Sequence, residues 1–93
     1  MNHPYATIYT REEGKIELTE YQWRVTDSTK LVPLTFHRVD GPAMIFSSGE
    51  ETYWLDDSIH FPEKYNQIID QVKSMSDTEK LLDSRWWVRE MVK

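Results

Sequence analysis

The chain has 93 residues, no cysteine and a formal net charge of −5, and 13% of its residues are aromatic. This length fits a single domain with a thin core, to which large aromatic rings can supply much of the buried area. The absence of cysteine excludes a secreted module that is stabilised by disulfides. The sequence shows neither an apolar leader nor an apolar run of about 18 residues, so we expect a soluble, cytoplasmic protein with no membrane segment.

Charge is distributed unevenly along the chain. Residues 39–63 carry six acidic side chains and no Lys or Arg. Such a segment repels phosphate backbones, so we expect no binding to nucleic acid. The acids form either a solvated face or a docking face for a basic partner.

The first predicted element is a strand over residues 5–10, which are rich in β-branched and aromatic side chains. A turn follows over residues 11–15. Gly14 supports the prediction of this turn, because glycine adopts positive φ without steric cost.

Alternating apolar residues predict further strand over residues 16–25. The alternation changes phase near residues 19–20, which indicates a bulge or a short break. Residues 26–30 are polar and typical of a turn. Another strand is predicted over residues 31–37, where Pro33 favours an edge position.

A hairpin is predicted in the middle of the chain. Residues 40–42, Asp-Gly-Pro, mark a turn. Residues 43–47 and 51–55 are its two strands, with the tip at Ser48-Gly49. Residues 56–58 turn again before a short Ile59-His60 segment.

The most regular helical pattern covers residues 62–75, with proline at the first helical position. Spacings of three and four residues make one apolar stripe, formed by Phe61, Tyr65, Ile68, Val72 and Met75. We expect Tyr65, Ile68 and Val72 to be buried. A capping box at residues 76–79 predicts a second helix. Residues 85–92 fit either helix or strand, with helix favoured.

These elements predict one α+β domain. Its residues 4–60 form a small antiparallel β-meander of hairpins, and residues 61–93 are mainly helical. The C-terminal helix or helices pack on the meander, since a single hairpin is not stable alone.

Residues 37–60 have a pattern of their own: His-Arg-Val-Asp-Gly-Pro-Ala, an apolar strand, Gly49, then Tyr53-Trp54 and His60. This pattern resembles a repeat in hypothetical proteins of tailed bacteriophages and some bacteria, which has "HREDGPA", an apolar strand, a glycine turn, "WY", "NG" and then the His of the next copy. The resemblance implies a small phage or prophage accessory protein without established catalysis. A weaker echo over residues 3–23 suggests a first, degenerate hairpin copy.

The repeat-like segment supplies the first group of candidate binding residues, which are His37, Arg38, Asp40, Tyr53, Trp54 and His60. Two interpretations remain open for them. Gly, Pro and Asp commonly build turns, and a tryptophan opposite the hairpin strand can fill a core. Alternatively, the loop grips a ligand.

A second group lies near the C-terminus: Arg85, Trp86, Trp87 and Arg89. Adjacent tryptophans cannot face the same side of a helix or strand. Either both are buried by different neighbours, or one is exposed beside arginine and anchors a partner. The second alternative predicts a partner surface over residues 85–92, with a symmetric homodimer as the expected form.

We predict neither a metal site nor a catalytic site. His3, His37 and His60 have no compact ligand spacing. Residues 47–49, Ser-Ser-Gly, are no nucleophile elbow, and the paired carboxylates lie in predicted turns where solvation is expected. No cofactor is expected.

The leading functional prediction is therefore a non-catalytic phage accessory protein that binds and modulates a host protein. One alternative is a sponge for a small molecule such as a nucleotide signal, which needs Arg38, Arg85 and Arg89 to meet in one pocket. A small hydrolase would need His37 or His60 to face an acid in a cleft. A structural virion component is the remaining alternative.

Overall fold

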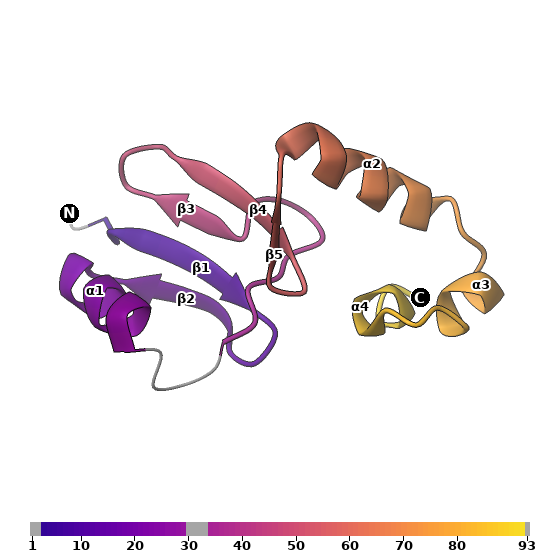
Figure 1. Ribbon diagram of the computed structural model, residues 1–93, viewed down its shortest axis with the longest axis horizontal. Helices are drawn as coiled ribbons and strands as arrows, with labels where there is room; N and C mark the ends of the chain where they lie inside the picture. Colours follow the sequence, from indigo (N-terminus) through magenta and orange to yellow (C-terminus); the bar gives the residue numbers. More distant parts are fainter. Residues whose placement is uncertain (1–2, 30–33, 93) are drawn as a thin grey trace.

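The computed structural model describes residues 3–29 and 34–92, and the side chains of residues 27–29 lie outside the description. Within these residues the chain forms one antiparallel five-stranded sheet in the order β2-β1-β3-β4-β5 (Figure 1). The α+β class is therefore confirmed. The strands are β1 (Ala6–Thr10), β2 (Gly14–Leu18), β3 (Met44–Phe46), β4 (Glu51–Leu55) and β5 (Ser58–His60).

Two hairpins make up most of the sheet. The first joins β1 to β2 through the predicted turn, and Gly14 has a φ of +70°. The second joins β3 to β4, as predicted for residues 43–55, and continues into β5. Antiparallel pairing of β1 with β3 places the hairpins side by side, with Ala6 opposite Phe46.

The prediction of strand over residues 21–25 is wrong, because helix α1 spans Glu20–Thr29 and includes most of the predicted turn at residues 26–30. Thr19 starts this helix with a reciprocal cap. Its Oγ1 accepts a hydrogen bond from the Gln22 backbone N–H at 3.2 Å, and its own N–H donates to Gln22 Oε1 at 2.9 Å. Trp23 packs edge-on against the Phe46 ring at 5.1 Å, whereas Tyr21 is exposed.

The strand predicted over residues 31–37 lies partly outside the described residues. Its described part is irregular backbone that runs along the end of β1. Phe36 forms a single bridge to Thr10, and the His37 N–H donates to the Tyr9 carbonyl at 3.0 Å. Pairing at isolated positions replaces the predicted strand here.

The helical part follows β5 directly. Helix α2 spans Pro62–Lys73 and confirms the helix predicted for this region. Helix α3, Asp77–Leu81, begins with the predicted capping box at Ser76. Helix α4, Trp86–Arg89, is a single turn, so the ambiguous C-terminal segment is helical at its centre.

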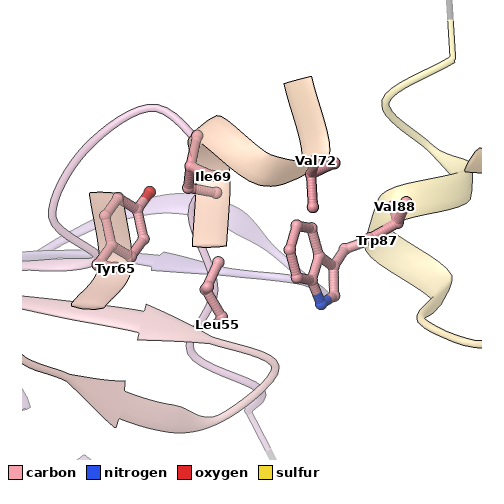
Figure 2. Packing of buried hydrophobic residues seen from close by; sticks show 6 residues of the cluster. All are labelled: Leu55, Tyr65, Ile69, Val72, Trp87 and Val88. Carbon is pink, nitrogen blue, oxygen red and sulfur yellow. The ribbon is translucent and has the colours of Figure 1, made fainter. Parts of the chain in front are cut away.

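The sheet has a hydrophobic cluster on each face because side chains alternate along a strand. One cluster contains Ile8, Leu18 and Met44, with Trp23 of α1 packed against it. Figure 2 shows the other, in which α2 and α4 meet β4. It consists of Leu55, Tyr65, Ile69, Val72, Trp87 and Val88.

Two members of the predicted apolar stripe of α2 are placed differently. Ile69 is buried instead of Ile68, which is half-buried at the margin of the cluster. Phe61 lies outside the stripe, because it is the N-cap residue and its backbone is extended, with φ −64° and ψ 149°. Its side chain is 85% exposed.

None of the helices in the described parts of the chain has the length and apolar character needed to cross a bilayer.

Candidate functional site

The turn that opens the repeat-like segment is organised around Arg38. Its Nε contacts Asp40 Oδ1 at 3.0 Å, and its Nη1 donates to the Pro42 carbonyl at 3.1 Å. The guanidinium also lies 3.9 Å from the centre of the Tyr9 ring. The approach to Gly41 is close, since a Cβ there would lie 3.1 Å from Arg38 Cζ and would displace the guanidinium. Arg38 and Asp40 therefore shape this turn.

Helix α2 fixes the same turn through Tyr65. The Tyr65 hydroxyl donates to the Arg38 carbonyl and accepts from the Gly41 N–H at 3.3 Å. Burial raises the pKa of Tyr65 above its ordinary value, because the phenolate would lose its hydration. The turn and the helix are thus joined through one buried oxygen.

His37 joins the sheet to α4. Its ring centre lies 4.6 Å from that of Trp86 and 5.7 Å from that of Trp87, and its Nδ1 accepts from the Asp56 N–H at 3.0 Å. Trp86 donates from Nε1 to Asp56 Oδ1 at 2.9 Å, and the Arg11 guanidinium lies over the Trp86 ring. Burial lowers the pKa of His37, although nearby acids oppose the effect.

The C-terminal candidates are engaged within the chain. Arg85 binds both oxygens of Asp83 at 2.9 and 3.0 Å, and Arg89 donates to the Asp83 carbonyl at 2.6 Å. Hydrogen bonds from Arg85 lower the pKa of Asp83 to about 2. Trp87 is only 4% exposed.

The two tryptophans face different neighbours, as expected, but neither is the exposed ring that a surface over residues 85–92 needs. Trp87 enters the hydrophobic cluster under α2, and Trp86 is half-buried against His37. A homodimer through this segment stays a prediction, and the exposed tryptophan that was expected to anchor it is not present.

Trp54 is also structural. It lies on the α1 side of the sheet, where its ring meets Phe36 edge-on at 5.3 Å. Its Nε1 donates to Thr52 Oγ1 at 2.9 Å. The Trp54 ring therefore fills a hydrophobic cluster, as the structural interpretation of the repeat-like segment expects.

The three arginines of the sponge hypothesis do not share a ligand site. Arg38 holds the turn before β3, whereas Arg85 and Arg89 hold Asp83 after α3. Each guanidinium donates to a carboxylate or carbonyl of the chain itself. This arrangement does not favour phosphate binding by the three together.

A pocket of about 400 Å³ opens between the β4–β5 hairpin and the start of α2. Two predicted residues, Tyr53 and His60, line it. Sequence reasoning missed Ile59 and Phe61, which are 58% and 85% exposed. The remaining lining residues are Glu51, Thr52, Pro62 and Lys64.

We call the surface formed by Ile59, His60, Phe61 and the pocket beside them the β5–α2 patch. The signal that could have revealed it is an apolar-His-apolar run immediately before Pro62. A residue that precedes Pro is driven toward extended backbone, so Phe61 could not take a helical orientation.

The described residues contain no group of three or more His, Cys, Asp or Glu side chains placed to hold a metal ion. His37 is packed against α4 and His60 lines the β5–α2 pocket, while His3 is exposed near the start of the chain. The three histidines therefore belong to separate parts of the structure.

No family model, curated protein or solved structure matches this chain. The resemblance of residues 37–60 to a phage repeat stays a prediction.

Proposed function

We propose that this protein is a non-catalytic accessory protein of a phage or prophage, which binds and modulates a host protein through the β5–α2 patch. The observation that supports binding is the exposure of Phe61 and Ile59 beside a pocket. Large apolar side chains at a concave surface are common anchors of protein interfaces. The phage origin rests on the sequence pattern of residues 37–60.

The placement of the other candidates supports this choice of surface. His37, Arg38, Trp54 and Trp87 make contacts that hold the turn, the sheet and α4 together. At the β5–α2 patch, by contrast, two apolar side chains face solvent at the end of the sheet. Burying them against a partner would release water from apolar surface, which favours association.

The test is a capture experiment with three immobilised proteins: the wild type, Phe61→Ser and Leu82→Ser. Phe61→Ser removes the anchor and places a preferred residue at the N-cap of α2, so the fold is kept. Leu82 is a matched control, because it is 81% exposed and lies at the end of α3, away from the pocket.

We expect the wild type and Leu82→Ser to retain the same protein from a bacterial lysate in stoichiometric amount, and Phe61→Ser to lose it. Mass spectrometry identifies the retained protein. Equal retention by all three chains, or loss with Leu82→Ser alone, would contradict the proposed surface.

A further inference from the structure

Strand β5 is the last strand on one side of the sheet, and its orientation shows which backbone groups face outward. The Trp54 carbonyl accepts from the Arg38 N–H at 3.1 Å, so the polar backbone groups of Trp54 point away from β5. Trp54 and Ile59 are register partners. Because hydrogen-bonded and non-bonded pairs alternate in antiparallel strands, the N–H and C=O of Ile59 face the open edge.

The two edges of the sheet differ in their protection. On the β2 edge, Lys15 and Glu17 form an ion pair at 3.5 Å, and charged side chains of this kind discourage strand pairing. Strand β5 contains no Asp, Glu, Lys or Arg and presents an exposed Ile59. Its edge is therefore the one suited to an added strand.

From this edge we infer the form of the partner: an extended, basic segment of the bound protein pairs with β5 as an additional strand and inserts an apolar side chain into the pocket. The inference rests on the proposed function, since it names how the β5–α2 patch binds. Backbone hydrogen bonds to Ile59 supply the alignment, while Phe61 and the pocket select an apolar side chain.

Charge around the patch favours lysine or arginine in that segment. Glu51 lines the pocket, and Glu63 lines a neighbouring hollow beside Phe61. Lys64 is the cation that borders both, and residues 39–63 contain no Lys or Arg. Alternating basic residues on the segment would meet these carboxylates, which guides both recognition and approach.

A second copy of this chain is a poorer occupant of the same edge. Both halves of such an interface would carry the same acidic side chains, Glu51 and Glu63, and no basic segment to complement them, which gives like-charge repulsion. Each strand has only three residues, so few backbone hydrogen bonds would offset that repulsion.

The probe is a short acetylated and amidated peptide that alternates lysine with valine and has phenylalanine at its centre. Its control has glutamate in place of lysine. Binding is followed by backbone amide NMR shifts of the intact protein. We expect saturable shifts at Ile59 and Phe61 with the lysine peptide, and at least tenfold weaker binding of the glutamate peptide.

Two variants test the backbone pairing. Ile59→Pro removes the outward N–H and leaves the bonds to β4 intact, because proline is tolerated at an edge position whose N–H faces solvent. Ile59→Thr removes the same side chain but keeps the N–H. We expect Ile59→Pro to bind the lysine peptide about five- to tenfold more weakly than Ile59→Thr, the effect of one lost hydrogen bond.

Equal affinity of these variants overturns strand addition, and so does equal affinity of the two peptides. Strand addition is also overturned if the lysine peptide causes no saturable amide shifts at concentrations up to about 1 mM. It is overturned as well if the Ile59 amide shifts when the protein alone is diluted, because that result identifies a second copy of the chain as the occupant. The proposed function fails separately: it falls if lysate capture does not depend on Phe61, whatever the peptides do.

Discussion

Replacing Tyr65 with phenylalanine removes one oxygen atom from the junction between α2 and the turn at residues 40–42. That hydroxyl donates to the Arg38 carbonyl and accepts from the Gly41 N–H. A hydrogen bond contributes about 0.5–1.5 kcal/mol net, and both backbone partners are half-buried, so water replaces the oxygen only in part. We expect a loss of about 1–2 kcal/mol in the free energy of unfolding.

This loss is measurable by urea and thermal unfolding monitored by tryptophan fluorescence. It corresponds to a fall of about 4–16 °C in Tm for a domain of this size. Tyr53→Phe is the matched control, because the Tyr53 ring lies 4.9 Å from that of Tyr65, yet within the described residues its hydroxyl forms no hydrogen bond. The control should lose no more than about 0.5 kcal/mol.

The raised pKa of Tyr65 gives a second readout of the same variant. The folded state holds the hydroxyl proton more tightly than the unfolded state, so stability falls as pH rises above about 10, the ordinary tyrosine pKa. Tyr65→Phe should lack this part of the alkaline loss. A variant as stable as the wild type, or a Tyr53→Phe variant with an equal loss, would refute the described junction.

Two further outcomes follow from the packing. Ile69→Ala should destabilise the fold by about 2–5 kcal/mol in urea unfolding, and Ile68→Ala by clearly less, because of the two only Ile69 is fully within the cluster. The reverse order would show that Ile68, and not Ile69, is the buried residue of the α2 stripe. The lowered pKa of His37 means that the unfolded chain binds its proton more readily, so stability should fall as pH drops below about 6.5, while Asp83, with a pKa of about 2, contributes only at lower pH. His37→Phe should reduce the change of unfolding free energy with pH between pH 7 and 5. If that pH dependence is unchanged in the variant, it arises from other groups.

The sequence predicted the elements that strong local signals define. Residues 43–55 form a hairpin because Gly41 and Pro42 precede its first strand and Gly49, with a φ of +95°, lies at its tip. The capping box at Ser76 identified the start of α3 for a similar reason: both of its hydrogen bonds are made within four consecutive residues. Such short-range chemistry depends little on the rest of the fold.

Helix α1 shows how a periodic pattern can mislead. Tyr21 and Val25 alternate with Trp23 as in a strand, but Thr19 and Gln22 have the residue types and spacing of a capping box. The cap settles the conformation, and within the described residues Trp23 packs against a hydrophobic cluster whereas Tyr21 is exposed. Giving the cap more weight than the alternation would have predicted the helix.

The candidate site was harder to predict because burial depends on contacts between distant residues. His37 and Trp86 are 49 positions apart, and nothing local indicates that their rings are in contact. Phe61 fits the spacing of the α2 stripe, yet its backbone is extended, so its ring points to solvent. Apolar spacing identified the helix, but the extended N-cap determined which apolar side chain remained exposed.

The repeat-like segment therefore combines two tasks at different residues. Its His37, Arg38 and Trp54 hold the turn and the sheet, so substitutions there lower stability before they affect any contact with a partner. Ile59 and Phe61 follow at its end, where exposed side chains can change at small cost in stability. On the proposed function, such a scaffold can change its partner while keeping its fold, because the proposed contact residues are not those that hold the domain together.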